Sequence, residues 1–364
     1  MSAKLKVFQV LECGGGGGTG NQVAWLCNGL DPQRFEAGLI YAVRDGEDPE
    51  QYRSKASGAF SIYYMPEMTR EISPWRDFKS LLKLYRIFRE QKPDIAHAHS
   101  SKAGFLARTA AWLAGVPKIF YTPHGYGFLQ LDRPACSRSF YRLLEWLVSW
   151  IGEIIAVSPS EAALAQKLSW GKPVHLVCDP YLGKMPPGPL LEHSGVVIGS
   201  CGRMTAARNT GAFVNLCRGL GRSRQDIKCV WIGGGEEEPS VKSALAGKAE
   251  VTGWLDCEQA RERLRGLDIL AHYSRWDGLP NAVLEAMALG LPVVASEVPG
   301  CRDCVIHGET GYLARNESEL LEYCLKLADS PALRKKLGEA GRQLVVERFN
   351  RDSALRRLEQ TYTR

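Results

Sequence analysis

The most specific pattern in this 364-residue chain is the segment Tyr273-Ser-Arg-Trp-Asp-Gly-Leu-Pro-Asn-Ala-Val-Leu-Glu-Ala-Met-Ala-Leu-Gly-Leu-Pro-Val-Val-Ala-Ser296. It follows the apolar run Ile269–His272, and Pro280 stands where a proline favours the start of a helix. The apolar run Pro292–Ser296 comes directly after that helix. A strand, a helix and a second strand in this order form the βαβ unit of a parallel sheet.

The same alternation of strand and helix continues on both sides of this unit, which predicts an α/β fold with parallel sheets. The expected strands are residues 6–11, 37–43, 94–98, 118–122, 153–157, 174–177, 196–200, 229–232, 269–272 and 292–296. The expected helices include residues 22–30, 74–90, 102–113, 139–151, 159–168, 331–348 and 351–362.

A run rich in proline and glycine, Asp179–Pro189, interrupts the alternation and predicts a linker over residues 179–194. We therefore expect two Rossmann-like domains, residues 1–178 and 195–345, whose sheets face each other across a cleft. Residues 346–364 are expected to form a C-terminal helix that packs back on the first domain. Ligands of such sheets bind at the carboxyl ends of the strands, so the cleft is the expected site.

Composition limits the class of protein. The chain is 45% hydrophobic and 24% charged, as in ordinary globular proteins, and its net charge of +6 gives no argument for a nucleic-acid partner. Eleven scattered cysteines indicate reduced thiols. The early apolar run Val7–Leu11 is too short for a signal peptide, and no uncharged apolar stretch is long enough to span a membrane. We expect a cytoplasmic protein, with peripheral contact at the inner face of the plasma membrane as a further expectation.

The run Gly15-Gly-Gly-Gly-Thr-Gly20 formally matches the dinucleotide pattern G-x-G-x-x-G, but a run of glycines matches many patterns. Asp45, after the second strand, leaves a nicotinamide-binding interpretation open, whereas Asn21-Gln22 excludes a P-loop. The glycines either let the backbone approach a ligand or form a structural turn.

Two further strand ends carry candidate ligand contacts. Gly202-Arg-Met-Thr-Ala-Ala-Arg-Asn209 places Arg203 and Arg208 after a strand, where guanidinium groups could hold a diphosphate or remain solvated on the surface. Gly233 ends the next strand, either for close approach of a ligand or in an ordinary turn.

The segment Tyr273–Ser296 adds two carboxylates and two backbone amides to these candidates. Asp277 lies in a loop after a strand, and the amides of Gly278 and Leu279 are donors beside it. Glu285 lies on the following helix, where its carboxylate can accept hydrogen bonds from the vicinal hydroxyls of a ribose. The alternative is that Glu285 is a buried helix acid with internal partners.

Together with His97-Ala-His-Ser-Ser-Lys-Ala-Gly104 and Tyr121-Thr-Pro-His-Gly125, these segments resemble the retaining glycosyltransferases of family 4, and most of all those of bacterial surface-polysaccharide assembly. The resemblance covers nearly the whole chain and implies the GT-B fold. It implies transfer of a hexosyl or N-acetylhexosaminyl group, by family habit from a UDP-sugar, to a glycan or a polyprenyl-diphosphate-linked acceptor. Because no D-x-D motif is present, we expect no metal and no other cofactor.

The resemblance also implies residue roles: the two arginines bind the donor diphosphate, Glu285 holds the ribose, Asp277 contacts the transferred sugar, and His124 lies near that sugar. The catalytic candidates are His124, Asp277 and Glu285. The donor-binding candidates are Gly16, Gly17, Gly18, Arg203, Arg208, Gly233, Gly278, Leu279, Asn281 and Glu285. The acceptor candidates are His99, Ser100, Ser101 and Lys102, for which a helix cap with a packed histidine is the alternative.

The chain departs from the family pattern at two positions, where Arg208 replaces the usual Lys and Asp277 the usual Glu. No pair of carboxylates is arranged for double displacement, so front-side attack with help from the leaving phosphate is the expected mechanism. A nucleotide-sugar epimerase of the same fold, a Rossmann oxidoreductase and a non-enzymatic assembly scaffold are the alternative functions.

The segment Ser137–Trp150 mixes aromatic residues and cations at helical spacing. Such a stripe can lie at a membrane interface, but it is more often part of a core, and we expect the core.

Overall fold

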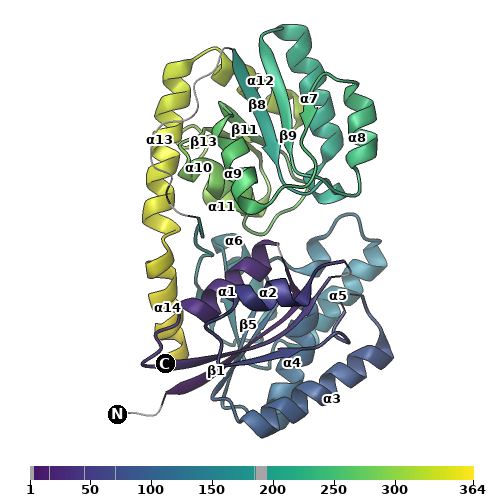
Figure 1. The fold of residues 1–364 in the computed structure, drawn as a ribbon, viewed down its shortest axis with the longest axis vertical. Coiled ribbons are helices and arrows are strands. Elements are labelled where there is room, and N and C mark those ends of the chain that lie inside the picture. The colour runs from purple at the N-terminus through teal and green to yellow at the C-terminus, as the bar shows by residue number, and fades with distance from the viewer. Residues whose placement is uncertain (1–3, 16, 45, 70, 184, 186–194) are drawn as a thin grey trace. The chain divides into compact units, whose positions relative to one another are not determined.

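The protein is described by a computed structural model that covers residues 4–15, 17–44, 46–69, 71–183, 185 and 195–364. The chain divides into two compact units (Figure 1). The first comprises Met1–Leu129, Arg133–Leu182 and Arg351–Arg364, so it includes the C-terminal helix. The second comprises Gln130–Asp132 and Gly183–Asn350.

The described part of the first unit holds a sheet of seven parallel strands in the order β3-β2-β1-β4-β5-β6-β7. These are β1 (Leu5–Gly14), β2 (Phe35–Val43), β3 (Ser61–Tyr64), β4 (Ile95–His99), β5 (Lys118–Thr122), β6 (Glu153–Ala156) and β7 (Val174–Leu176). The order reverses beside β1, whose neighbours are β2 and β4. A parallel sheet opens a crevice at such a reversal, at the carboxyl ends of its strands.

Two helical layers cover this sheet. The helices are α1 (Gly18–Gly29), α2 (Pro49–Lys55), α3 (Pro74–Gln91), α4 (Ser101–Ala114), α5 (Ala135–Val148), α6 (Pro159–Leu168) and α14 (Arg351–Thr363). Side chains of α3, α4 and α6 share one core with the sheet, and side chains of α1, α2 and α14 share the other. The α14 helix, last in the chain, is thus part of the first unit's core.

The second unit holds, among its described residues, a sheet of six parallel strands in the order β10-β9-β8-β11-β12-β13. These are β8 (Val196–Cys201), β9 (Ile227–Ile232), β10 (Glu250–Val251), β11 (Ile269–His272), β12 (Val293–Ser296) and β13 (Gly311–Ala314). This order reverses beside β8, between β9 and β11. The second unit therefore repeats the architecture of the first.

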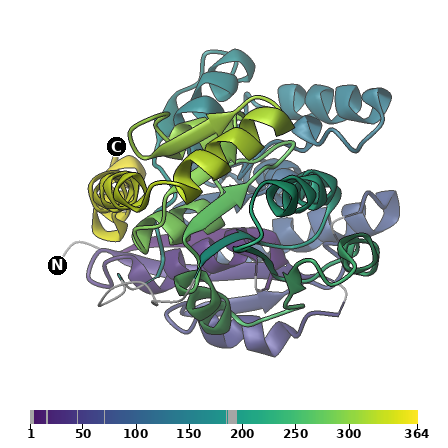
Figure 2. The same ribbon diagram turned by 90° about the horizontal axis from the view of Figure 1, so that it is seen from above.

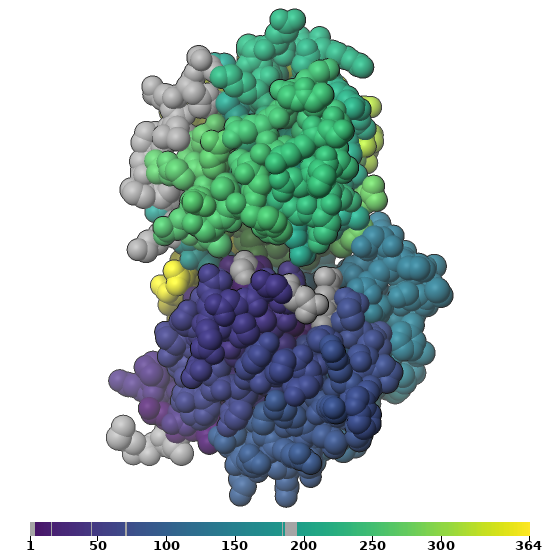
Figure 3. All heavy atoms as spheres, turned by 45° about the vertical axis from the view of Figure 1, so that its right-hand side comes forward, coloured from purple at the N-terminus to yellow at the C-terminus, as the bar shows by residue number. Residues whose placement is uncertain are grey.

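Helices cover both faces of the second sheet as well. They are α7 (Thr210–Ser223), α8 (Glu238–Leu245), α9 (Cys257–Arg265), α10 (Asn281–Ala288), α11 (Pro299–Cys304), α12 (Glu317–Ala328) and α13 (Pro331–Arg348). The long α13 helix is upright in Figure 1 and is seen end-on in Figure 2. In the space-filling view of Figure 3, side chains fill the spaces that the ribbons leave open within each unit.

The predicted α/β fold with two Rossmann-like parallel sheets is confirmed. The strand β5 and the helices α6 and α13 have the expected bounds. The expectation for the glycine run was wrong in one respect: α1 begins at Gly18, so only the residues before it can belong to a loop. The short elements α2, β3, β10 and β13 were missed, because each is too brief to show a periodic pattern.

The expectation that Ser137–Trp150 contributes a core stripe was wrong for most of its apolar side chains. Phe140 and Leu143 are each 49% exposed on α5, whereas Glu145 of the same helix is buried. The outward face of α5 is therefore apolar. Its inward face carries a charge.

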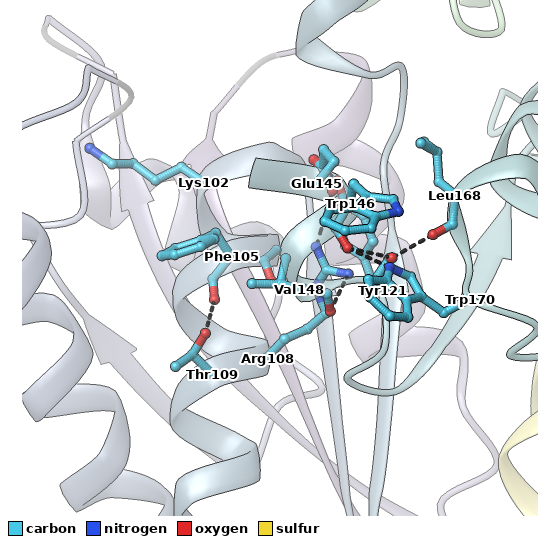
Figure 4. A network of polar contacts seen from close by, with 12 residues as sticks. Lys102, Phe105, Arg108, Thr109, Tyr121, Glu145, Trp146, Val148, Leu168 and Trp170 are labelled. Carbon is cyan, nitrogen blue, oxygen red and sulfur yellow. Dashed lines mark hydrogen bonds and ion pairs between the residues drawn. The ribbon is translucent and has the colours of Figure 1, made fainter. Parts of the chain in front are cut away.

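The buried charge of Glu145 is compensated by Arg108 of α4 and by Tyr121 of β5 (Figure 4). Arg108 Nη2 lies 3.1 Å from Glu145 Oε2, and the Tyr121 hydroxyl donates a 2.7 Å hydrogen bond to Oε1. Burial raises the pKa of Glu145, and Arg108 opposes that rise. Local periodicity could not show that the polar side of α5 faces inward.

All eleven cysteines are free thiols, in agreement with the expectation from their scatter. In the described ranges no helix combines the length and the apolar character that crossing a membrane requires.

The contact between α10 and α13 gives a test of the packing in the second unit. A Cβ at Gly338 would lie 1.8 Å from the carbonyl oxygen of Gly290, whereas one at Gly221 of α7 would meet nothing within 4 Å. We expect Gly338→Ala to lower the free energy of unfolding by about 1–3 kcal/mol through overpacking. The control Gly221→Ala should raise it by up to about 1 kcal/mol through helix propensity. Urea denaturation measures both, and equal effects of the two substitutions would contradict this packing.

Candidate functional site

The strand-order reversal in the second unit brings the loops after β8 and β11 together. The backbone amide of Arg275 donates to the carbonyl of Ala207 at 2.8 Å. Arg208 forms an ion pair with Asp277, and its Nη1 also donates to Ser274 Oγ at 3.0 Å. The first of the two loops thus supplies a cation and the second supplies its counter-ion.

Asp277 is held as a carboxylate by two partners. Its Oδ2 accepts from Arg208 and lies 3.0 Å from His272 Nε2. Burial opposes the charged form, but Arg208 and His272 outweigh burial and hold the pKa of Asp277 well below its usual range. Burial lowers the pKa of His272 itself. Asp277 therefore orients the Arg208 guanidinium, whatever else it contacts.

The glycines at these strand ends bring backbone segments close together. Gly233 has a φ of +128°, and a Cβ there would lie 2.4 Å from the carbonyl oxygen of Gly202. A Cβ at Gly300 would lie 1.9 Å from the carbonyl oxygen of Gly278, so the Asp277–Gly278 loop packs directly on the start of α11. The positive φ and the close backbone contact therefore explain a glycine at position 233 without a ligand.

Glu285 lies on α10, which begins at Asn281, and Leu279 lies just before that helix. The Oε1 atom of Glu285 is 3.7 Å from Nε of Arg261, which lies on α9. Burial raises the pKa of Glu285, and Arg261 opposes the rise. Sequence reasoning missed Arg261, because α9 carries several charged residues and nothing in their spacing distinguishes this one. Arg203, two residues after the end of β8, is half-buried.

The glycine run of the first unit contains a close backbone approach. A Cβ at Gly20 would lie 2.8 Å from the carbonyl oxygen of Gly15, so the first turn of α1 packs on the end of β1. Gly17 immediately precedes α1, and Gly18 is its first residue. Two sequence candidates, Gly16 and Asp45, lie outside the described residues.

Of the four acceptor candidates, His99 ends β4 and the other three follow it, and the structure gives their side chains internal partners. His99 is 1% exposed. Ser100 Oγ lies 3.4 Å from Cys13 Sγ. Ser101 and Lys102 begin α4, and Lys102 Nζ forms a 2.7 Å ion pair with Asp77 of α3.

Glu12 of β1 is a residue that sequence reasoning missed at the start of α4. Its carboxylate accepts from the backbone amides of Lys102 and Ala103, at 3.4 and 3.2 Å. The helix N-terminus that could have held a phosphate thus already has an anionic side chain from this chain.

His124 lies at a polar junction of the first unit. Its Nε2 is 3.1 Å from His99 Nδ1, and its Nδ1 is 3.1 Å from Asp179 Oδ2. Burial opposes a charge on His124, but Asp179, followed by Glu161 and Glu12, raises its pKa above the ordinary value. The residue has a φ of +50°, which is uncommon for a residue other than glycine.

Glu161 supports the backbone beside His124. Its carboxylate accepts from the amides of Gly125, at 2.7 Å, and Val157, at 3.0 Å. Sequence reasoning named neither Glu161 nor Asp179. A signal for Glu161 was present, because Ser158 stands three residues before it in the pattern of a capping box. Asp179 has no comparable local signal.

Within the described ranges, no group of three or more His, Cys, Asp or Glu side chains is arranged to hold a metal ion.

Two protein-family models match the chain. The model described as "Glycosyl transferase 4-like domain" matches residues 17–180, and the model described as "Glycosyl transferases group 1" matches residues 195–330. The first match falls largely in the first unit, and the second falls in the second unit.

Curated relatives extend over most of the chain. The UDP-Gal:alpha-D-GlcNAc-diphosphoundecaprenol alpha-1,3-galactosyltransferase of Escherichia coli is 27% identical and covers 77% of this chain and 76% of its own. The capsular polysaccharide biosynthesis glycosyltransferase CapM of Staphylococcus aureus is 25% identical and covers 87% of each chain.

Solved structures share the fold over nearly the full length. Sucrose-phosphate synthase from Thermosynechococcus elongatus aligns with a TM-score of 0.80 at 18% identity, over 98% of each chain. HepE from Anabaena, crystallised with UDP and glucose, aligns with a TM-score of 0.78 at 14% identity, over 99% of each chain.

The Arg208–Asp277 ion pair allows a prediction about the free energy of unfolding. Arg208→Met leaves the Asp277 carboxylate buried with only His272 beside it, and we expect the free energy of unfolding to fall by about 3 kcal/mol. Urea denaturation provides the measurement. The control Arg315→Met, which removes an ion pair with an exposed arginine, should leave the midpoint nearly unchanged.

A double variant separates the ion pair from simple loss of packing. Asp277→Asn in the Arg208→Met background removes the unpaired charge and should recover part of the lost stability. If the double variant is less stable than the single variant, the ion pair does not explain the loss.

Proposed function

The chain belongs to the group 1 glycosyltransferases and has the GT-B fold, and on this premise we propose that it is a retaining, metal-independent enzyme. In this proposal it moves a hexosyl or N-acetylhexosaminyl group from a UDP-sugar to a glycan or a polyprenyl-diphosphate-linked acceptor in polysaccharide biosynthesis. The observation that carries the proposal is the meeting of Arg208, Asp277 and Ser274 at the strand-order reversal of the second unit. This is the place where a parallel sheet binds its ligand.

The relatives support the choice of donor and acceptor. The name of the Escherichia coli relative contains a UDP-linked galactose as donor and a sugar on diphosphoundecaprenol as acceptor. HepE was crystallised with UDP and glucose. These facts favour UDP as the nucleotide and a lipid diphosphate as the carrier of the acceptor.

In the proposed donor complex, Arg203 and Arg208 bind the diphosphate. A guanidinium group donates two parallel hydrogen bonds to a phosphate, which gives the contact direction as well as charge. Arg208 is already oriented by Asp277 and Ser274, so little side-chain entropy is lost when it binds the donor.

The ribose and the sugar bind beside this diphosphate position. Glu285 accepts hydrogen bonds from the two ribose hydroxyls, with Arg261 limiting the rise of its pKa so that it remains an acceptor. The backbone amides of Gly278 and Leu279 and the first turn of α10, which includes Asn281, contribute donors for the phosphates and the sugar.

The proposed reaction breaks the bond between sugar C1 and the leaving phosphate oxygen and forms a bond from C1 to the acceptor oxygen on the same face. The proton of the acceptor hydroxyl passes to the leaving phosphate oxygen, so no separate base is needed. Charge on the departing UDP is offset by Arg203 and Arg208, as preorganised cations offset developing charge in other active sites. His124 is the substrate-contacting residue of the first unit in this proposal.

We also propose that the first unit touches the inner face of the plasma membrane through α5. Phe140, Leu143 and Leu147 are exposed on the outward face of this helix, and Arg142 is exposed among them. An exposed apolar helix face beside cations fits an anionic lipid surface. A lipid-linked acceptor would be present at that surface.

The donor site can be tested by thermal shift followed by assay. UDP-sugars are screened, and at 100 times the dissociation constant a ligand should stabilise the protein by about 2.7 kcal/mol. UDP release with an acceptor is then measured. We expect Glu285→Ala to lower kcat/KM at least a hundredfold, about 2.7 kcal/mol, and Glu285→Gln to lower it less.

The matched control is Glu322→Ala, which removes an exposed acid from α12 of the same unit and should leave turnover unchanged. Near-wild-type turnover in Glu285→Ala would exclude the proposed donor site. Release of a rearranged free sugar without an acceptor would instead indicate the epimerase activity.

Membrane contact is tested by co-sedimentation with vesicles that contain anionic phospholipid. The double variant Leu143→Glu/Leu147→Glu places two negative charges on the outward face of α5 and should abolish co-sedimentation. Trp254→Ser is the control, because Trp254 is an apolar residue of the second unit that is even more exposed, at 67%. Wild-type protein that stays in the supernatant would contradict the proposal.

A further inference from the structure

A row of polar side chains crosses a buried face of the first sheet. Its members are Gln9, His97, His99 and Thr122, which are 0–3% exposed. They lie on three neighbouring strands: Gln9 is in register with His97 across β1 and β4, and His99 with Thr122 across β4 and β5. The apolar side chains buried on this face pack under α1 and α14. A polar row in such a place is costly unless every group has a partner.

The row is joined to the last helix of the chain. Tyr362 of α14 is fully buried, and its hydroxyl lies 3.1 Å from Gln9 Nε2 and 2.6 Å from His97 Nδ1. His97 Nε2 lies 2.8 Å from the Thr122 hydroxyl. Tyr362 is therefore the point at which α14 enters the hydrogen-bond chain.

The amide of Gln9 gives this chain a direction. Its Nε2 can only donate, and it donates to the Tyr362 hydroxyl. Its Oε1 can only accept, so His99 Nε2, 2.8 Å away, must carry a proton. With its Nε2 protonated, a neutral His99 has an unprotonated Nδ1 that can only accept.

The direction continues to His124. Since His99 Nδ1 accepts, the proton between the two rings belongs to His124 Nε2, 3.1 Å away. The other nitrogen of His124, Nδ1, lies 3.1 Å from the Asp179 carboxylate and must also donate. Both nitrogens of His124 then carry protons, which is the charged imidazolium form.

We propose that His124 is held as an imidazolium, in one ring orientation, by hydrogen bonds that it donates in two directions. Its Nε2 donates into a chain that continues through His99 and Gln9 to the Tyr362 hydroxyl, and its Nδ1 donates to Asp179. Gln9, His99, Tyr362 and Asp179 are positioning residues in this proposal. They act on the reaction only through the charge and the orientation of His124.

A neutral His124 that still donates from Nδ1 to Asp179 requires the whole chain to reverse. If His124 loses its Nε2 proton, His99 must donate from Nδ1 and accept at Nε2. The Gln9 amide must then turn over, and the Tyr362 hydroxyl must donate to Gln9 instead of accepting from it. The charge on His124 is thus coupled to the hydroxyl of a residue on α14.

The charges around His124 agree with the imidazolium form. The carboxylates that face it are Asp179, after β7, Glu161 of α6 and Glu12 of β1, and each raises its pKa. Burial lowers the pKa of both His97 and His99, which lie on β4, so those two rings stay neutral. The three carboxylates therefore surround one cation.

The consequence for catalysis rests on the proposed function, in which His124 contacts the sugar substrate. A fixed N–H direction and a permanent charge are ready before the transition state forms, so they cost no reorganisation during the reaction. A cavity of about 20 Å³, lined in part by His124, His99 and Asp179, lies beside the row.

The test is nitrogen-15 NMR of the full-length protein, whose histidines number only seven. At pH 7 we expect both nitrogens of His124 to give the signature of a protonated ring, and His99 to be protonated on Nε2 alone. Asp179→Asn should lower the pKa of His124 by at least one unit, a tenfold change in its protonation equilibrium. Asp226→Asn, at an exposed ion pair of the second unit, is the control and should change neither ring.

The Tyr362→Phe variant tests the far end of the chain while keeping the aromatic ring in the core. Its loss of the hydroxyl should free the Gln9 amide to turn over, so His99 should become a mixture of its two tautomers. A singly protonated His124 in the wild-type protein at pH 7 would overturn the proposal, as would an unchanged His99 in Tyr362→Phe. Neither NMR result depends on turnover, so failure of the proposed function is a separate outcome.

The pH dependence of activity and stability gives a second readout. A His124 pKa above the unfolded value contributes stability at pH below that unfolded value, and the contribution is lost as pH rises through the folded pKa. We expect kcat/KM to fall over the same range, and Asp179→Asn to move that fall to lower pH. If the row only stabilised the fold, Asp179→Asn would lower the free energy of unfolding without moving the pH profile of kcat/KM.

Discussion

The reversal of strand order beside β1 and beside β8 is the constraint on which both halves of the molecule depend. In a parallel sheet, the connections on either side of a reversal leave in opposite directions, so a crevice opens at the carboxyl ends of the two strands. His99 and Gly14 lie at that position in the first unit. Arg208 and Asp277 follow it in the second. Residues far apart in the chain meet there because of topology alone.

Charges at these strand ends are compensated within each unit. Asp277 is paired with Arg208, Lys102 with Asp77, and Glu12 accepts from the first amides of α4. A buried charge without a partner would cost several kcal/mol, so these partners stabilise the fold before any ligand binds. The Arg208–Asp277 pair also preorganises the guanidinium group that the proposed donor contacts.

The fold was predictable because its pattern is local. Apolar runs, the proline at the start of α6 and the capping serine before it determine bounds that the structure reproduces for that helix. The exposed face of α5 was not predictable in this way. Periodicity shows that a helix has two faces, but only the Arg108 and Tyr121 partners of Glu145 determine which face is buried.

The residues of the candidate site show the same difference between what local sequence reveals and what it does not. Arg203, Arg208, Asp277 and Glu285 could be named from the sequence, because they lie in short segments whose residue types and spacing carry the information. Arg261 and Asp179 could not be named, since each acts on a residue from another element. Glu161 had a local capping signal, but its hydrogen bond to the amide of Gly125 did not. The sequence by itself determined two parallel α/β sheets and the strand ends that carry the charged groups. Only the tertiary structure decided which partner each group has, because hydrogen bonds between distant strands and α14 leave no local periodicity in the chain.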